Sequence, residues 1–327
     1  MDFRTQLPPS ESPFQLQYQD TILSMGSCFA EHIGQRLSDH KFGLHLNPFG
    51  ILYNPLSLID ALYFLASDDE IEEDDLFQHQ DLWHHFSFHG RFSHPDRTTA
   101  LEQMRSSIRK IRSEWPKINR VMLTFGTAYA FQNKQTGAFV ANCHKLPGSA
   151  FERVRLPAED FIFNYLNLLE EWKALQPDLQ VLISVSPMRH IRDGLVENQR
   201  SKAILVLAAD ELVKALEFVH YFPAYELVLD DLRDYRFYAK DLIHPNEMAV
   251  DYVWEFFKAS CITKDTLEIY DKVQSILQAA RHRPFHENTA GHRKFCERQL
   301  SQIAELEGKY SWLDLSKEKD YFIQSIP

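Results

Sequence analysis

The sequence predicts an α/β protein built on a parallel sheet, and two observations lead to this prediction. Short apolar runs typical of strands alternate along the chain with longer segments whose apolar residues recur every three or four positions. The chain has 327 residues, of which 44% are hydrophobic, so it can bury a large core. Strands that alternate with helices form parallel sheets covered by helices on both faces. We therefore expect one large domain with an appendage, or two domains.

Each element is predicted from its own local pattern. Strands are expected at four short apolar runs: residues 21–24, 120–125, 180–186 and 224–229. Helices are expected where apolar residues follow helical spacing: directly after the first strand, over residues 55–66, 98–115, 158–175 and 198–219, and after Pro245. In the first of these helices Phe29, Ile33 and Leu37 form the apolar stripe. The second begins with Pro55, which suits a first helical turn.

Two segments interrupt this alternation. Residues 67–97 are first acidic (SDDEIEEDD) and then rich in histidine and aromatic residues, so we expect an insertion with little regular structure. From about residue 263 the chain is charged and helical in pattern, without a strand that would extend the sheet. We therefore expect a sheet domain over residues 1–262 and a helical extension over residues 263–327.

Charge and cysteine content exclude several classes of protein. Lys and Arg number 35 against 46 Asp and Glu, a net charge of −11, which disfavours nucleic acid and anionic membranes as partners. The N-terminus lacks the pattern of a signal peptide, and no apolar run is long enough to span a membrane. The four cysteines lie far apart and form no CxxC pair. We expect a cytoplasmic protein with reduced thiols, no cofactor and no metal ion; the oligomeric state is not predicted.

Residues with catalytic chemistry follow the predicted strands. In parallel sheets such groups collect at the carboxyl ends of the strands. The segments at these positions are Gly26-Ser27-Cys28, Gly126-Thr127, the run from Ser186 to Arg189 and His190, and the later pair Asp241 and His244. A serine on the first turn and an Asp-x-x-His near the end of the sheet are the parts of a Ser-His-Asp triad.

These residues and their order resemble the SGNH (GDSL-type) hydrolases. Within that group, the motifs GSCFA, NPFGILYNP, TFGTAY, ANCHK and SPMRH resemble the GSCFA family over residues 15–260. The resemblance implies a three-layer α/β/α fold of flavodoxin-like type and ester chemistry. It also implies that Ser27 is the nucleophile, His244 the base and Asp241 the group that orients the imidazole.

The sequence departs from the SGNH pattern at two of its blocks. Gly26 stands where the first block has aspartate, and Ala128 stands where the third block, Gly-x-Asn-Asp, has an asparagine that holds the oxyanion. The loss of one such donor costs about a hundredfold in rate. We expect Asn142 or His144 to replace it, together with the backbone amide of Ser27; alternatively, both side chains only brace their loop.

Three of the candidate catalytic residues have alternative interpretations. Ser27 is also well suited to cap the first helix, because serine is a favoured N-cap. Asp241 and His244 could form a loop salt bridge in which His244 also caps the following helix. Cys28 could be the true nucleophile, although a cysteine that enters an apolar helix face is more often part of the core.

Two further sets of residues bear on binding. The insertion carries histidines at residues 79, 84, 85, 89 and 94, whose spacing matches no metal template, so we expect a lid or wall over the pocket. Arg189 and His190 could hold an anionic or hydroxyl-bearing substrate, or pair with the acidic surface.

We expect a hydrolase that cleaves an ester, with a small acyl group on a carbohydrate-like or metabolite alcohol. An O-acyltransferase is an alternative, because a sugar hydroxyl can resolve the same acyl-enzyme in place of water. A catalytically silent binding module is a second alternative. The missing asparagine favours the silent module, whereas the presence of Ser27, Asp241 and His244 argues against it.

Overall fold

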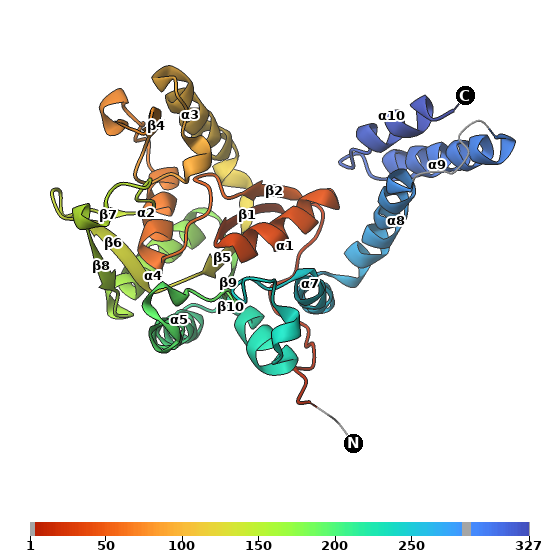
Figure 1. The fold of residues 1–327 in the computed structure, drawn as a ribbon. Coiled ribbons are helices and arrows are strands. Elements are labelled where there is room, and N and C mark those ends of the chain that lie inside the picture. Colours follow the sequence, from red (N-terminus) through yellow and green to blue (C-terminus); the bar gives the residue numbers. More distant parts are fainter. Residues whose placement is uncertain (1–3, 283–288, 327) are drawn as a thin grey trace.

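A five-stranded parallel sheet forms the centre of the molecule (Figure 1), in a computed structural model that describes residues 4–282 and 289–326. Its strand order is β10-β9-β5-β1-β2. The strands are β1 (Thr21–Gly26), β2 (Gly43–Leu46), β5 (Ile118–Phe125), β9 (Gln180–Val185) and β10 (Val219–Phe222). Counted along the chain, this is the flavodoxin-like order 2-1-3-4-5. The predicted parallel sheet is confirmed, with β2 as an additional edge strand that the sequence pattern did not reveal.

Helices cover both faces of the sheet, so the domain has three layers. One face carries α2 (Pro55–Ala66), α3 (Arg97–Glu114), α4 (Glu159–Leu175) and α5 (Leu195–Ala215). The other carries α1 (Cys28–Asp39), α7 (Glu247–Cys261) and the segment before β1. Alternate residues of β5 serve the two layers: Val121 and Leu123 pack with the first set of helices and Met122 with the second. The strands are apolar on both sides because both sides are buried.

The strand predicted at residues 224–229 is wrong. The last strand, β10, lies earlier, and Pro223 ends it. The chain then forms α6 (Ala224–Glu226) and the π-helical turn η6 (Leu227–Leu232). The buried apolar residues there are Ala224, Leu227, Val228 and Leu232. Their separation by three and four positions is a helical period, so the apolar run buries one face of a helix.

The segment at residues 67–97 is more regular than expected. It contains the hairpin of β3 (Phe77–His79) and β4 (Leu82–His84) between the short turns η1 (Glu73–Asp75) and η2 (Gly90–Phe92). A second small sheet follows β5, with β6 (Tyr129–Asn133) between β7 (Phe139–Val140) and β8 (Phe151–Arg155). Further short turns are η3 (Trp115–Lys117), η4 (Gly148–Ala150), η5 (Ile191–Asp193) and η7 (Tyr235–Phe237).

The C-terminal region is helical, as predicted, and stands to one side of the sheet domain (Figure 1). Its helices α8 (Lys264–Arg281), α9 (Ala290–Lys309) and α10 (Ser316–Gln324) share an apolar core of their own. Several contacts join them to the sheet domain. Lys41 pairs with Glu318 at 2.9 Å, the ring of Trp312 stacks on Tyr18, and Tyr270 of α8 packs against His40 and Trp254. Among the described residues, no helix combines the length and apolar character that crossing a membrane requires.

Candidate functional site

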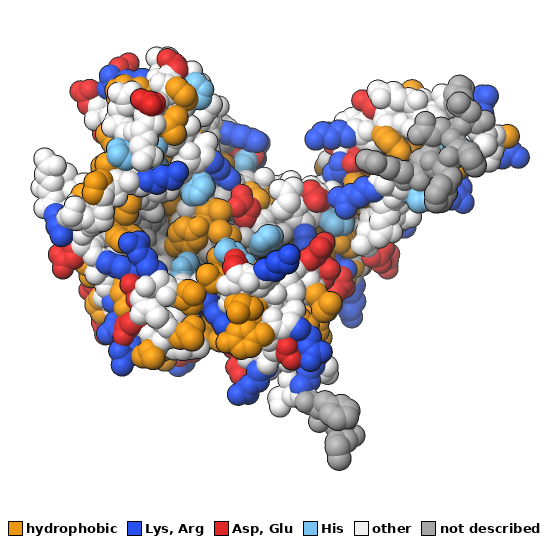
Figure 2. Space-filling view, viewed as in Figure 1, with side chains coloured by type: hydrophobic (Ala, Val, Ile, Leu, Met, Phe, Trp, Pro, Cys, Tyr) orange, Lys and Arg blue, Asp and Glu red, His pale blue; other side chains and the backbone are white. Residues whose placement is uncertain are grey.

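The order of the strands places a crevice between β1 and β5. From β1 the chain runs to β2 at one edge and then returns to β5 on the other side of β1. At such a switch point the loops beyond the carboxyl ends of the strands diverge and leave room for a ligand. Figure 2 shows the molecule hollowed between the lobe that carries α3 and the body of the sheet domain, with hydrophobic side chains in the hollow and histidines around it.

The turn from β1 to α1 requires a glycine and caps the helix with serine. Gly26 has φ +146°, and a Cβ there would lie 2.3 Å from the carbonyl oxygen of Thr124. The next residue, Ser27, is the N-cap of α1: its Oγ accepts the N–H of Phe29 at 3.3 Å. Ser27 is 0% exposed, and its own N–H donates to Thr124 O at 3.3 Å. The capping interpretation therefore holds, and the amide expected to serve the oxyanion is already bonded.

Cys28 is the first residue of α1 and is partly exposed. Its Sγ lies 3.5 Å from the hydroxyl of Tyr53. Partial burial raises the pKa of the thiol, so the resting group is protonated. Cys28 is therefore not a core residue, as one interpretation of the sequence had it. The buried residues of α1 begin after it, with Phe29, Ala30 and Ile33.

The predicted pair Asp241 and His244 forms a hydrogen-bonded unit. His244 Nδ1–H donates to Asp241 Oδ2 at 2.6 Å, and the other carboxylate oxygen accepts the N–H groups of Ile243 (3.0 Å) and His244 (3.1 Å). These bonds, that of the Ile243 amide first, lower the pKa of Asp241 to about 2. Leu242 has φ +57°, which folds the loop back on itself. With Nδ1 as donor, Nε2 of His244 is left as the acceptor that a general base needs.

His244 does not cap the following helix, as one interpretation of the sequence had it. Asn246 is the N-cap of α7, and its side chain accepts the N–H of Ala249. The side chains of His244 and Asp241 are 44% and 45% exposed. The pair is therefore free to meet a substrate.

Arg189 supports the loop that carries His244. Its guanidinium lies 4.8 Å from the ring centre of Tyr235 and 4.3 Å from that of Tyr238. Its backbone N–H donates to Ile243 O at 3.2 Å. These contacts assign Arg189 a bracing role that neither interpretation of the sequence foresaw.

Gly126, Thr127 and His190 meet at the loop of Tyr53. The N–H groups of Gly126 and Thr127 both donate to Tyr53 O, at 2.7 and 2.9 Å, so neither is free for an oxyanion. The ring of His190 packs against the Tyr53 ring with centres 5.5 Å apart. Burial lowers the pKa of His190 to about 3, and its Nε2 is buried without a hydrogen-bond partner among the described residues. His190 is thus a neutral imidazole with an unused nitrogen.

Sequence reasoning missed Lys202, which joins the ends of two strands. Its Nζ is buried and donates to Gly126 O at 2.5 Å and to Ser186 O at 2.6 Å. Burial lowers its pKa to about 7. One signal was present in the sequence: Lys202 stands three residues before Leu205 and seven before Ala209, on the apolar face of its helix.

Asn47, in the motif NPFGILYNP, was also missed as a site residue. Its side chain is 0% exposed, and Oδ1 accepts the N–H of Gly26 at 2.9 Å. The Nδ2 of the same amide is buried and has no partner among the described residues. A buried donor without a partner beside the β1–α1 turn is suited to a developing negative charge.

Asn142 and His144 pack against the insertion. Asn142 Oδ1 accepts the N–H of His144 at 2.8 Å, which forms a local turn. His144 Nε2 lies 2.9 Å from His85 O, and its ring centre lies 4.4 Å from that of His84. Burial lowers the pKa of His144 to about 4. The described contacts of Asn142 and His144 stabilise their own loop and hold it against the insertion. Their role at the oxyanion stays a prediction.

One histidine of the insertion, His89, packs on the loop that follows Asn47. The N–H of His89 donates to Phe49 O at 2.8 Å, and the Cβ of His89 fills the space beside Gly50. Within residues 4–282 and 289–326, no three His, Cys, Asp or Glu side chains converge as metal ligands would. The wall or lid role of this segment stays a prediction.

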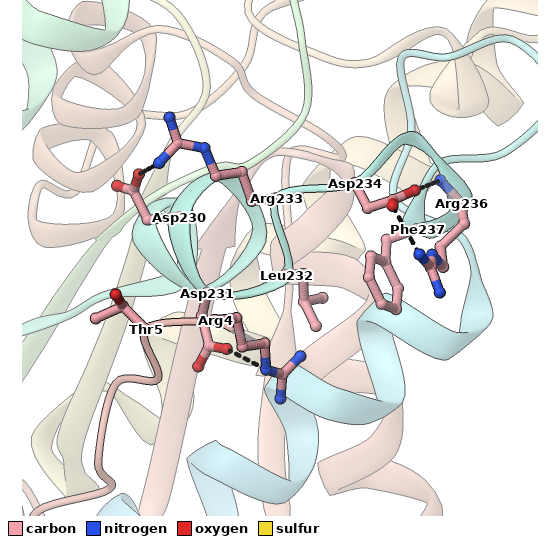
Figure 3. A pocket seen from close by; sticks show the side chains of 9 residues that line it. All are labelled: Arg4, Thr5, Asp230, Asp231, Leu232, Arg233, Asp234, Arg236 and Phe237. Atoms are coloured by element: carbon pink, nitrogen blue, oxygen red, sulfur yellow. Dashed lines mark hydrogen bonds and ion pairs between the residues drawn. The ribbon is translucent and has the colours of Figure 1, made fainter. Parts of the chain in front are cut away.

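A separate hollow lies away from these residues (Figure 3). It has a volume of about 780 Å³ and is lined by Arg4, Thr5, Asp230, Asp231, Leu232, Arg233, Asp234, Arg236 and Phe237. Each of its three arginines already pairs with an aspartate of the same hollow. None of the predicted catalytic residues lines it, so its size does not identify it as the reaction site.

Comparisons with known proteins give one family. The model described as the GSCFA family matches residues 21–257, and the model described as GSCFA domain protein, C-terminal domain, matches residues 273–326. No curated protein matches significantly. A solved structure, the acetyl xylan esterase Est2A from the rumen bacterium Butyrivibrio proteoclasticus, aligns with 80% of this chain at 9% identity and a TM-score of 0.34. The chain spans 66% of that esterase, just under two thirds, and so weak a likeness carries no argument about activity.

Proposed function

The chain belongs to the GSCFA family, and we propose that it is a hydrolase of the SGNH type that cleaves esters through an acyl-enzyme. The flavodoxin-like strand order supports the SGNH assignment, as does the position of a nucleophile turn after β1 and an Asp-x-x-His unit before α7. The match to the GSCFA model also confirms the family resemblance that the motifs indicated.

The observation that carries the proposal is the geometry of Asp241 and His244. The carboxylate accepts Nδ1–H at 2.6 Å and is itself held by two backbone amides. A carboxylate fixed in this way sets the tautomer of the imidazole and stabilises its protonated form. A surface salt bridge would not require the left-handed backbone at Leu242 that folds the loop around the carboxylate.

Two half-reactions follow from this arrangement. A side chain of the β1–α1 turn, for which the sequence predicts Ser27, attacks the ester carbonyl while His244 Nε2 takes its proton. The imidazolium then protonates the departing alcohol. Water, deprotonated by the same imidazole, attacks the acyl-enzyme and releases the acid. Asn47 Nδ2 is the buried donor best placed to meet the oxyanion.

The substrate class follows from the groups around the crevice. His190, a neutral imidazole packed on Tyr53, suits an uncharged alcohol better than an anion, which supports a small acyl group on a carbohydrate-like or metabolite alcohol. The net charge of −11 disfavours nucleic acid or an anionic membrane as partner. We place the reaction in the cytoplasm, without cofactor or metal.

One observation favours a second function. The catalytic pair is nearly half exposed, so a second alcohol could reach the acyl-enzyme as readily as water. An O-acyltransferase of the same mechanism is therefore the alternative candidate.

Hydrolysis of p-nitrophenyl acetate by wild type and by His244→Ala tests the proposal. We expect His244→Ala to lower kcat by about a thousandfold, within the range for loss of a general base. His292→Ala, at a partly exposed histidine of α9, is the matched control and keeps wild-type activity. Equal rates for wild type and His244→Ala would refute the proposal. Added glycerol that yields acetylglycerol faster than acetate would favour the transferase.

A further inference from the structure

We infer that the thiol of Cys28, rather than the hydroxyl of Ser27, is the nucleophile of the proposed reaction. This inference rests on the proposed function and assigns its attacking atom. It reverses the sequence-based preference for Ser27, because the structure shows that the two neighbouring side chains differ in exposure.

Accessibility is the first argument. Ser27 is 0% exposed, and its hydroxyl accepts the Phe29 N–H as the helix cap. A carbonyl carbon could reach this oxygen only if the first turn of α1 moved. Cys28 is partly exposed at the same turn, and its Sγ lies 3.5 Å from the hydroxyl of Tyr53.

The direction of the side chain is the second argument. Cys28 and His32 are four residues apart on α1 and therefore lie on the same face of the helix. Cys28 Sγ lies 3.5 Å from the hydroxyl of Tyr53, and the Tyr53 ring packs on His190. The residue before His190, Arg189, donates its backbone N–H to Ile243 O, next to His244. Tyr53, His190 and Arg189 thus connect the turn of Cys28 with the loop that carries His244.

The surroundings of the thiol supply further parts of a site. Tyr53 touches Cys28 through its hydroxyl and the ring of His190 through its own ring. Asn47, fully buried, binds the amide of Gly26 with Oδ1 and keeps Nδ2 without a partner among the described residues. A negatively charged oxygen formed beside the turn would satisfy this donor. The cysteine therefore stands in a set of polar groups, several of which have unused hydrogen-bonding capacity.

The proposed reaction consumes only the ester and water. His244 Nε2 takes the thiol proton as sulfur bonds to the ester carbon and the carbonyl electrons move to oxygen. When the carbonyl re-forms, the carbon–oxygen bond to the alcohol breaks and the imidazolium returns the proton to that alcohol. Water then adds to the thioester with His244 as base, the carbon–sulfur bond breaks, and the acid leaves with the thiol restored. Because partial burial keeps the resting thiol protonated, the first step needs this base.

Trapping the acyl-enzyme tests the inference. Wild type is mixed with p-nitrophenyl acetate, quenched in acid within the first turnovers, and digested for peptide mass spectrometry. We expect the acetyl group on Cys28 and its release by neutral hydroxylamine, as for a thioester. Cys28→Ala should form no adduct and lose at least about a hundredfold in kcat. Cys143→Ala, which removes the other partly exposed thiol, is the control and should behave as wild type.

The serine is tested in parallel. Ser27→Ala loses the helix cap and is at risk of folding poorly, whereas glycine replaces a cap residue at a cost of only a few tenths of a kcal/mol. We expect Ser27→Gly to keep the adduct on Cys28 and most of the activity. An acetyl group on Ser27, or wild-type kcat in Cys28→Ala, would overturn the inference and leave the proposed hydrolase intact. No adduct on any residue, with rates unaffected by His244→Ala, would overturn both.

Discussion

Gly26 is the residue on which the geometry of the candidate site depends. Its backbone φ is +146°, and an added Cβ would lie 2.3 Å from Thr124 O, so there is no room for a side chain. Because Gly26 has no side chain, β1 pairs with β5 up to Gly26, its last residue. The residues that follow therefore lie at the crevice.

Gly26→Ala should therefore damage both stability and activity. We expect the free energy of unfolding to fall by about 3 kcal/mol, from backbone strain and the forced separation of two strands. Urea unfolding followed by circular dichroism measures this. Gly148→Ala is the control, since a Cβ there meets nothing within 4 Å. Equal unfolding midpoints for the two variants would contradict the argument.

Asp241 acts on the substrate only through His244. In Asp241→Asn the amide can present a hydrogen instead of an acceptor to the ring, which favours the wrong tautomer. We expect kcat on p-nitrophenyl acetate to fall by about a thousandfold or more with little change in KM, since the imidazolium forms only during the reaction. Asp234→Asn, at an aspartate that binds Arg236 beyond this unit, serves as control. Unchanged kcat in Asp241→Asn would mean that the pair is a surface salt bridge.

At the scale of elements, the insertion is held to the sheet domain by neutral imidazoles. His144, from the loop after β7, packs its ring on His84 of β4, and burial lowers the pKa of His144 to about 4. The charged groups that bear on it are the neighbouring imidazoles of His84, His85 and His89. Protonation would place several positive charges side by side.

The fold should accordingly lose stability in acid. Between the ordinary value of 6.5 and about 4, the unfolded chain binds a proton at residue 144 that the folded chain does not. The free energy that neutral His144 contributes to folding is therefore complete above pH 6.5 and is lost as the pH falls towards 4. We expect His144→Gln to show a smaller drop in Tm between pH 7.5 and pH 5 than wild type. His94→Gln, at a partly exposed histidine of the same insertion, should keep the wild-type drop; parallel curves for all three proteins would rule out this role.

At the scale of the whole molecule, the C-terminal helices add stability without adding to the crevice. Trp312 stacks on Tyr18 with ring centres 4.6 Å apart, and Tyr18 stacks in turn on Phe42. None of the candidate catalytic residues contributes to the apolar core shared by α8, α9 and α10.

Trp312→Ala should lower stability and leave catalysis unchanged. We expect a loss of about 2 kcal/mol in unfolding free energy, from reduced apolar burial and a lost aromatic pair, with kcat within twofold of wild type. Leu175→Ala, at a side chain that is 80% exposed, is the control and should change stability by less than about 0.5 kcal/mol. A tenfold loss of kcat in Trp312→Ala would show that the extension acts on the site.

The sequence alone determined the features that depend on residues close together in the chain. The apolar stripe of α1, the bounds of α2 and the helical C-terminus follow from local periodicity. The pair of Asp241 and His244 could also be predicted, because a contact between residues three apart needs only one loop to close on itself. The family motifs could also be identified from the sequence alone, because each motif consists of consecutive residues.

Only the tertiary structure decided which side chains face the crevice. Burial of Ser27 and exposure of Cys28 depend on Thr124 and Tyr53, which lie far away in the sequence. The same holds for residues 224–232, where an apolar run fits a strand or a helix until packing selects one. Local patterns specify what an element is, whereas burial and the pKa of a side chain are set by groups that folding brings from elsewhere.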